Sequence, residues 1–539
     1  MTAKKKGYPF PMKSKLHSKR KLRQKYYLLP FVVLTGIFAS FRQPIIQTGA
    51  NVYSDIRRFI EVVNVVRDYY VDDVDTRSLV DGAIYGLLGK LDPHSVYIPA
   101  DKVAQIDEKI AGSYAGIGVD FMIQNKYPVL IAPFPDSPAQ RLRLHSGDII
   151  QKIGSVSTYG LSEGEVKSLL RGEIGSMIRL TVKRPDFAET LIFNVVRDRI
   201  PLQSVQCSFM IDREIGYIKL GRFARTTFGE VRDALSKLEK KGLKKLVFDL
   251  RDNSGGYLDQ AVAVTDLFLP GGRKIVYTKG RIPTANEEFY STSTTQLKKY
   301  PLVVLINGGT ASAAEVMAAA LQDWDRAVIV GKRSFGKGLV QNQVTLQDGA
   351  ELRVTIARYY SPSGRLIQRA FGSNFKDYFE NKSGERLNRE NTGKKVFTTF
   401  SGRKVYGGGG IKPDVEQNSY KISAATAKLE ARMLFFEFAS SHAKEIKQRY
   451  PDFGSFLHYY KISNDVLRRF WNFLRQKNIY YTDRQIPYIQ QEIKSEIARQ
   501  IWGNDHYFRV RLETDSQFHA AVASFPLADR FAVLSLGMR

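Results

Sequence analysis

The chain has 539 residues, 43% hydrophobic and 25% charged, which is long enough for about three or four globular domains. Its formal net charge is +27, a balance that would ordinarily suggest nucleic acid or an anionic membrane surface as a partner. No helix-turn-helix, zinc or RNA-binding signature accompanies this charge, so nucleic-acid binding is not expected. The single cysteine, Cys207, excludes an internal disulfide, so stability must come from the core.

Much of the positive charge lies in residues 1–25, which contain ten Lys or Arg and no acidic residue. The next sixteen residues, 26–41, carry no charge, and Arg42 ends the run. This run is slightly short for a membrane span, which needs about 17–25 residues, but longer than most signal-peptide cores. We predict an uncleaved signal anchor at 26–42 rather than a removed signal peptide, with the basic end in the cytoplasm and the remainder exported.

A helical segment is expected over residues 45–111, because apolar residues recur there at helical spacing. Asp92-Pro93 is a strong turn signal within it. His94 follows that turn, and we expect it to be structural because nothing near it suggests a second catalytic group.

Residues 112–200 begin with the loop Gly116-Ile117-Gly118-Val119 and continue as short strands with one amphipathic helix. Glycines in such a loop would free backbone N–H groups to hold the terminal carboxylate of a peptide, and the peptide would add to the edge of a sheet. The segment resembles a PDZ domain, and its loop falls on the carboxylate-binding loop of that family. The resemblance implies that Gly116, Ile117, Gly118 and Val119 bind a protein C-terminus.

Strand and helix patterns alternate through residues 201–420, which indicates an α/β layer fold with a mixed sheet. The apolar run 246–250 ends in a turn that contains Gly255 and Gly256. A second apolar run, 302–306, ends in two glycines and is followed by a stretch of helix formers.

Ser312 is predicted to lie where this second strand turns into a helix. Unpaired backbone N–H groups and the positive end of the helix dipole favour a developing negative charge there, as in serine hydrolases. A serine nucleophile needs a base, and Lys337, between two glycines, can act as one only if burial keeps it neutral. Gln341 lies about 13 Å further along an extended strand, so both can meet at one serine only if the chain turns between them.

Ser312, Lys337 and Gln341, in this order and spacing, resemble the active-site segments of the carboxyl-terminal processing peptidases, also called tail-specific proteases. The resemblance covers residues 50–420. It implies a PDZ-containing Ser-Lys serine endopeptidase in which Gln341 orients Lys337 or the substrate. It implies neither a metal nor a nucleotide cofactor.

The same family carries a motif similar to Asp-Leu-Arg-x-Asn-x-Gly-Gly at residues 249–256. By this resemblance, the N–H of Gly255 or Gly256 forms an oxyanion hole together with the N–H of Ala313. Two such donors are worth several kcal/mol in the transition state. Sequence alone leaves open which of the two glycines donates.

Residues 370–404 are polar, and we expect an insertion or a mobile loop there, after which the family pattern resumes at 406–415. Helical periodicity dominates residues 421–539 and predicts an all-α C-terminal domain outside the resemblance. Its aromatic positions are expected to form a core. The alternative is a dimerisation or adaptor surface.

Together these features predict an endopeptidase held in the inner membrane by its anchor, with its bulk in the periplasm. Its substrates would be unfolded or tailed proteins bound by their C-termini and cleaved through an acyl-enzyme. A homo-oligomer or an adaptor protein would be a further partner. The rival interpretations are a catalytically silent PDZ scaffold, a protease that waits for an activating partner, and a hydrolase of another substrate.

Overall fold

The computed structural model describes residues 47–537, except 104–112, 135–136, 146, 185–186, 188, 293–296, 373–377, 380–394 and 483–484. The predicted basic segment and signal anchor therefore lie outside the described residues. Within the part of the chain that is described, no helix is long and apolar enough to cross a membrane. The chain divides into two units, residues 1–83 and residues 84–539.

The described residues of the first unit are mainly helical, as the apolar periodicity predicts. Helix α1 spans Gln47–Tyr69, and α2 begins within this unit and spans Thr76–Leu88. Large apolar side chains of α1, such as Ile56, Phe59 and Ile60, are exposed.

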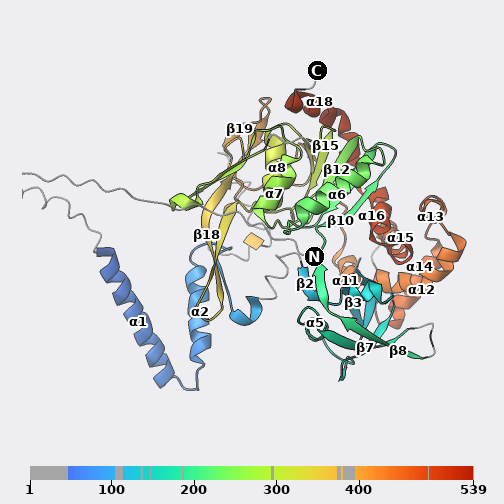
Figure 1. The fold of residues 1–539 in the computed structure, drawn as a ribbon, viewed down its shortest axis with the longest axis horizontal. Coiled ribbons are helices and arrows are strands. Elements are labelled where there is room, and N and C mark those ends of the chain that lie inside the picture. Colours follow the sequence, from blue (N-terminus) through green and yellow to red (C-terminus); the bar gives the residue numbers. More distant parts are fainter. Residues whose placement is uncertain are drawn as a thin grey trace, which may run out of the picture. The chain divides into compact units, whose positions relative to one another are not determined.

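Residues 113–201 of the second unit form a small β-module (Figure 1). The module has its own apolar core. Strand β2 (Ser113–Gly116) pairs antiparallel with β9 (Asp198–Pro201). An antiparallel sheet follows in the order β3 (Val119–Gln124), β4 (Tyr127–Pro133), β5 (Ile149–Ile153), β7 (Met177–Lys183) and β8 (Thr190–Val196), with β6 (Val156–Ser157) beside β5. The short α4 spans Pro138–Arg141, and α5 (Glu163–Leu170) begins at a capping box made by Ser162 and Glu165. Strand β3 is an edge strand of this sheet.

The core of the second unit is a six-stranded mixed sheet, as the alternating pattern predicts. Its order is β10 (Val205–Met210), β11 (Ile215–Leu220), β12 (Lys245–Asp249), β15 (Leu302–Ile306), β16 (Val328–Gly331) and β21 (Val415–Glu416). Strands β10 and β11 are antiparallel, and the other neighbours are parallel. One face packs against α6 (Thr227–Glu239), α7 (Leu258–Asp266) and α8 (Ala313–Asp323).

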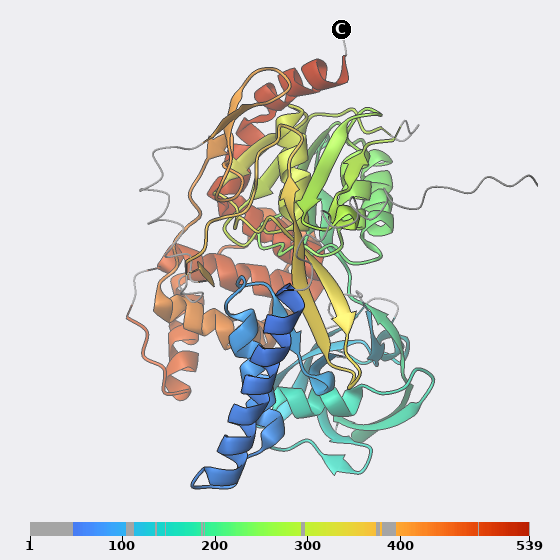
Figure 2. The ribbon, with the colours of Figure 1, turned by 90° about the vertical axis from the view of Figure 1, so that its left-hand side faces the viewer.

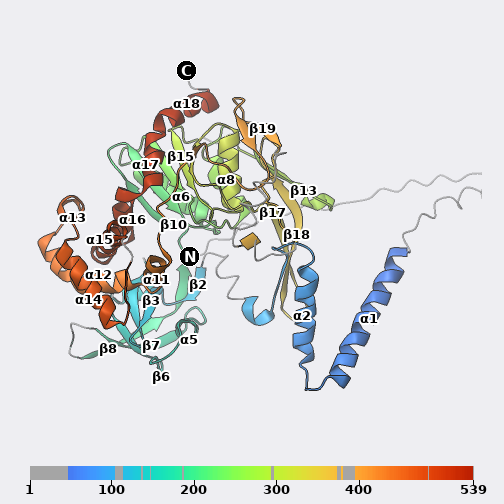
Figure 3. The same cartoon turned by 180° about the vertical axis from the view of Figure 1, so that it is seen from behind.

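The opposite face of this sheet is covered by the end of the chain. Helices α17 (Ser516–Ala523) and α18 (Phe525–Leu536) bury Phe518, Phe525 and Phe531 against the sheet. Figures 1 and 3 show the two faces in turn, with α7 and α8 in front in the first and α17 and α18 in front in the second.

The helices before α17 form a second, separate core. They are α11 (Ala424–Ala431), α12 (Leu434–Arg449), α13 (Phe453–Tyr459), α14 (Asn464–Gln476), α15 (Ile486–Trp502) and α16 (Asn504–Arg511), followed by the 3-10 turn η2 (Leu512–Thr514). The predicted helical domain 421–539 is thus divided between two cores. Apolar periodicity shows that a helix has a buried face but not which partner covers it.

A second sheet has the order β1 (Val96–Ile98), β18 (Glu351–Tyr360), β13 (Lys274–Gly280) and β14 (Glu288–Tyr290), with β17 (Leu339–Thr345) also paired to β18. The β17–β18 hairpin is the long yellow pair of strands in Figure 2. The 3-10 turn η1 (Pro283–Ala285) lies between β13 and β14.

Two expectations need correction here. The predicted helical segment 45–111 also supplies a strand, β1, because Tyr97 and Ile98 are buried against β18. The predicted loop 370–404 ends in structure, since β19 (Val396–Thr398) and β20 (Lys404–Tyr406) form a hairpin. Residues 373–377 and 380–394 of that loop lie outside the described residues.

Candidate active site

Ser312 lies at the strand-to-helix turn that the sequence predicts, between β15 and the first residue of α8. Its backbone has φ 56° and ψ −120°, a conformation that residues with a side chain rarely adopt. Such a conformation costs about 1–3 kcal/mol and persists where the surrounding structure enforces it, often at functional sites. This geometry agrees with a nucleophile at a sharp turn.

A buried carboxylate, Glu315, holds this turn to the lysine loop. Its two oxygens accept hydrogen bonds from the N–H groups of Ser312 at 2.9 Å, Gly336 at 2.7 Å and Lys337 at 2.8 Å. The Ser334 hydroxyl donates a fourth at 2.5 Å. Burial raises the pKa of Glu315 to about 7, although these four hydrogen bonds act in the opposite direction.

Sequence reasoning assigned Glu315 no role in the site. The signal was present, because Ser312 and Glu315 have the S-x-x-E spacing of a capping box. The spacing explains the bond from Glu315 to the Ser312 N–H. It cannot show the bonds to Gly336 and Lys337, which depend on tertiary structure.

The side chains of Lys337 and Gln341 contact each other in the structure. Lys337 Nζ donates to Gln341 Oε1 at 2.9 Å, and the register of β17 against β18 shifts between Val340 and Gln341. The lysine is half-buried. Burial lowers its pKa, the charge of Arg353 lowers it further, and the charges of nearby carboxylates oppose the shift. A lowered pKa is what a lysine base requires.

Gln341 is held in turn by the loop that contains His94. The Gln341 Nε2 group donates to the main-chain carbonyl of His94, and the His94 imidazole Nε2 lies 2.8 Å from the hydroxyl of Tyr378. Burial, followed by the charge of Lys337, lowers the pKa of His94 to about 4, so its imidazole is neutral at pH 7. The expectation of a structural histidine agrees with this arrangement, in which His94 supports the glutamine with its main chain.

Ser312 and Lys337 share no hydrogen bond between their side chains in this structure. Catalytic hydrogen bonds are often long or absent in ligand-free enzymes and tighten when substrate binds. The structure therefore connects the two residues through the Glu315 carboxylate. Their catalytic roles stay a prediction.

The turn after β12 places its glycines against Ser312. A Cβ on Gly255 would lie 2.8 Å from Ser312 Cβ and 3.0 Å from the Ala313 nitrogen, so no side chain fits there. The Gly255 N–H donates to Asn253 Oδ1 at 2.9 Å, whereas those of Gly256 and Ala313 have no acceptor among the described residues. This leaves Gly256 and Ala313 as the free donors of the predicted oxyanion pair.

A cavity of about 570 Å³ joins the predicted peptide-binding loop to the same glycines. Its lining includes Ile117 and Val119 from that loop as well as Gly255 and Gly256. The N–H groups of Ile117 and Gly118 have no acceptor within the described part of the chain. A peptide in this groove would therefore lie close to Ser312.

Comparison with known proteins gives three family matches. Peptidase family S41 matches residues 214–372, the "Activating protease CtpB N-terminal domain" matches residues 42–102, and a family of unknown function (DUF8443) matches residues 430–503. The chain is 38% identical over 322 residues to the carboxy-terminal-processing protease of Bartonella bacilliformis, covering 59% of this chain and 74% of that protein. It is 33% identical over 337 residues to the carboxy-terminal processing protease CtpA of Bacillus subtilis, covering 62% and 71%.

Solved structures are also similar to parts of the chain. A photosystem II D1 C-terminal processing protease is 26% identical, with 67% of this chain and 92% of that chain covered and a TM-score of 0.35. The PDZ domain of the carboxy-terminal protease from Vibrio cholerae, in complex with a peptide, is 28% identical, with 17% and 99% covered and a TM-score of 0.16.

The mixed α/β core and the S41 match over it define the class of protein as a serine-type peptidase. The identity to the Bartonella bacilliformis protease, over 74% of its length, then fixes the family. The chain belongs to the carboxy-terminal processing proteases of peptidase family S41. This confirms the resemblance seen in the sequence.

Proposed function

We propose that the chain is an endopeptidase that uses Ser312 as nucleophile and Lys337 as general base. Ser312 Oγ attacks the carbonyl carbon of the peptide bond while neutral Lys337 Nζ takes its proton. The C–N bond then breaks, the amine leaves with that proton, and water hydrolyses the acyl-enzyme. The observation that carries the proposal is a half-buried Lys337 of lowered pKa, hydrogen-bonded to Gln341 and fixed to the Ser312 turn through Glu315.

The negative oxygen of the tetrahedral intermediate would be held by backbone donors. The free N–H groups of Gly256 and Ala313 support this role, and α8 adds the positive end of its dipole. Gln341 would orient Lys337, since its own amide is held by the His94 carbonyl.

Substrate capture is proposed for the β-module. The terminal carboxylate of a protein tail would bind the N–H groups of the loop 116–119, and the tail would add to the edge strand β3. The cavity shared with Gly255 and Gly256 supports delivery of the captured tail to the site. Unfolded or tailed proteins are therefore the proposed substrates.

An inner-membrane anchor with the bulk in the periplasm completes the proposal. It is supported by the basic segment 1–25 and the uncharged run 26–41. Self-association is also proposed, because α1 exposes the apolar residues Ile56, Phe59 and Ile60.

The test is cleavage of an unfolded protein with a free apolar C-terminus by the full chain in detergent micelles. We expect Ser312→Ala to abolish cleavage. The matched control is Ser236→Ala, which alters an exposed serine of α6 and should leave the rate unchanged. Cleavage by Ser312→Ala at the wild-type rate would contradict the assignment of the nucleophile.

A protease that needs activation is the second candidate, because Ser312 and Lys337 are not hydrogen-bonded here. In that case the full chain alone would be inactive and would gain activity in cell-envelope extract, while Ser312→Ala would stay inactive in both. A scaffold without catalytic activity would show no cleavage under any of these conditions.

A further inference from the structure

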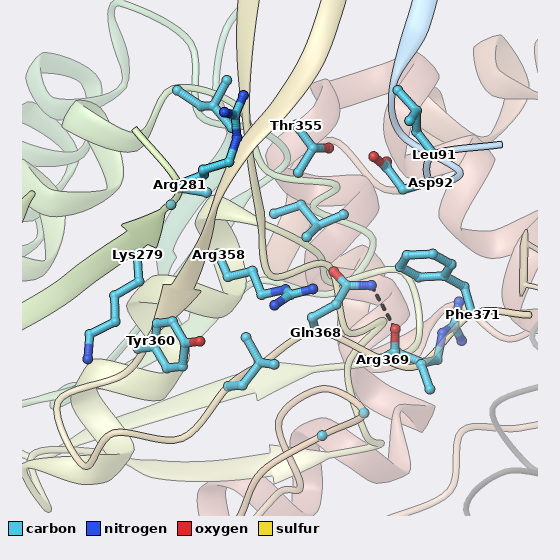
Figure 4. Close-up of a pocket in the computed structure, with 18 residues that line it drawn as sticks. Leu91, Asp92, Lys279, Arg281, Thr355, Arg358, Tyr360, Gln368, Arg369 and Phe371 are labelled. Carbon is cyan, nitrogen blue, oxygen red and sulfur yellow. Dashed lines mark hydrogen bonds between the residues drawn. The ribbon is translucent and has the colours of Figure 1, made fainter. Parts of the chain in front are cut away.

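A second cavity, of about 840 Å³, lies on the other side of the lysine loop (Figure 4). Neither Ser312 nor Lys337 lines it, and it is distinct from the groove that reaches Gly255 and Gly256. Its walls come from β13, β18, the start of β17 and the segment 366–371. Nothing in the proposed mechanism uses this cavity.

Two residues of its wall bracket the catalytic lysine. Gln368 Oε1 accepts the N–H of Gly338 at 2.8 Å, and the N–H of Arg369 donates to the Gly336 carbonyl at 2.8 Å. Lys337 lies between these two attachment points. A chain bound in the cavity would therefore lie beside the loop that carries the proposed base.

The charge of the cavity is strongly one-sided. Four cationic residues line it, Lys279, Arg281, Arg358 and Arg369, against a single carboxylate, Asp92.

The Asp92 carboxylate is already occupied. Its Oδ1 accepts the N–H groups of His94 at 2.8 Å and Ser95 at 2.9 Å, and its Oδ2 accepts the Ser95 hydroxyl at 2.7 Å. These bonds fix the loop 92–95 and use three of the roughly four lone-pair sites of the carboxylate, which leaves no room for a bidentate arginine. The four cations of the cavity wall therefore outnumber its one carboxylate, and that carboxylate is held by the loop 92–95.

Two of the four cations are engaged with neighbours. The Arg369 guanidinium packs over the rings of Phe335 and Tyr378 and donates to the Tyr378 carbonyl at 2.6 Å. Lys279 Nζ lies 5.5 Å and 5.9 Å from the ring centres of Tyr277 and Tyr360.

The side chains of Arg281 and Arg358 are exposed at the rim of the cavity and form no ion pair or hydrogen bond with any described residue. Arg358 lies opposite Leu339 in the β17–β18 pairing, two residues beyond Lys337. Figure 4 shows its side chain extending across the cavity towards Gln368. A planar guanidinium without a partner is suited to a carboxylate, which it can bind through two parallel hydrogen bonds.

We propose that this cavity is a subsite that binds a carboxylate of the polypeptide substrate, with Arg358 as its main contact and Arg281 as a second. The inference rests on the proposed function and adds a preference for acidic sequence beside the cleaved bond. The carboxylate has two sources, an Asp or Glu side chain or the new C-terminus that cleavage creates. Both present the same group to Arg358.

The first test compares two tailed peptides that share the scissile bond and apolar C-terminus but carry either Asp or Asn on both sides of that bond. We expect the wild type to favour the Asp peptide in kcat/KM by about tenfold or more, the effect of one charge-assisted bidentate pair. The preference should shrink as salt is added. Equal kcat/KM values for both peptides would reject the side-chain source.

The variants then locate the preference. Arg358→Gln should bring the Asp-to-Asn ratio close to one, and Arg358→Lys should retain part of it because the charge remains. The matched control is Arg232→Gln on the exposed surface of α6, which should keep the full ratio. A ratio unchanged in Arg358→Gln would overturn the assignment.

A product arm separates the two sources of the carboxylate. The N-terminal cleavage fragment, with a free acid or an amide end, is used as an inhibitor of the wild type and of Arg358→Gln. If Arg358 holds the new C-terminus, amidation should weaken inhibition of the wild type more than that of the variant. An equal effect of amidation on both enzymes would show that the new C-terminus binds the β-module loop instead of Arg358.

A binding experiment distinguishes failure of the subsite proposal from failure of the proposed peptidase function. Labelled Asp and Asn peptides are titrated by fluorescence anisotropy into full-length Ser312→Ala, with and without Arg358→Gln, so that no turnover is needed. Tighter binding of the Asp peptide that Arg358→Gln removes would support the subsite even in an inactive protein. Equal binding of the Asp and Asn peptides, together with equal inhibition by the free-acid and amidated fragments, would reject the subsite.

Discussion

At the scale of single residues, the site depends on how burial shifts the pKa values of three side chains. Burial lowers the pKa values of Lys337 and His94, which favours their neutral forms, and it raises the pKa of Glu315, whose negative charge is destabilised there. Each shift has desolvation as its largest cause. The fully buried Glu315 carboxylate thus fixes the loop of the half-buried Lys337.

Activity should therefore depend on pH through Lys337. Burial lowers the pKa of Lys337 from its usual value, and only the neutral amine can take the Ser312 proton, so kcat/KM should fall as pH falls through the folded pKa. The measurement is a pH–rate profile on an uncharged peptide, with stability checked at each pH. A profile that is flat from pH 9 to pH 5 would argue against a lysine base.

Glu315→Gln should disturb the positions of Ser312 and Lys337. The amide keeps one acceptor oxygen but turns an NH₂ group towards backbone donors that now share the carboxylate. We expect kcat to fall by about 10–100-fold with little change in KM, the effect of losing one or two hydrogen bonds to a charged group. Glu437→Gln, a partner of Lys477 in the helical core, is the control. A larger effect on KM than on kcat would point to substrate binding instead.

At the scale of elements, two strand-to-helix turns meet. The turn after β12 brings Gly255 against the Ser312 turn after β15, because the two strands are parallel neighbours and their ends lie at the same edge. The close approach needs a residue without a Cβ. It also needs φ +100° at Gly255, which favours glycine.

Gly255→Ala should accordingly remove activity. The added methyl group would lie 2.8 Å from the Ala311 carbonyl oxygen and from Ser312 Cβ, so either the Ser312 turn or the turn after β12 must shift. Gly229→Ala in α6 is the control, since nothing lies within 4 Å of its added Cβ. We expect the control to keep full activity with equal or slightly higher stability. Normal cleavage by Gly255→Ala would show that these turns are not in the site.

At the scale of the whole molecule, the end of the chain is part of the peptidase core. Helices α17 and α18 cover the sheet face opposite α8, so the sheet that carries Ser312 is enclosed on both sides. A buried ion pair strengthens the junction, since Arg251 contacts Asp249 at 2.6 Å and Asp515 at 2.6 Å. The region beyond residue 420 is therefore not a detachable appendage.

Phe531→Ala should weaken the peptidase core directly. Its ring is buried between α18 and the sheet, and removing it should cost about 3–5 kcal/mol of unfolding free energy. Hydrogen exchange should accelerate in β15 and β16, which α18 contacts. The control is Val533→Ala, which is half exposed on the same helix. Unchanged exchange in these strands would contradict the shared core.

The sequence by itself determined the family, the mixed sheet and the strand-to-helix position of Ser312, and it left open whether Gln341 orients Lys337 or the substrate. These features are local, because the patterns that predict strands, glycine turns and helix N-termini each extend over only a few residues. Only the tertiary structure decided what covers the sheet and what fixes the site. Glu315 reaches across 22 residues to Lys337, the His94 carbonyl across 247 residues to Gln341, and α18 packs on a strand more than two hundred residues earlier. Such contacts depend on how elements pack together, and no single stretch of sequence specifies its partner.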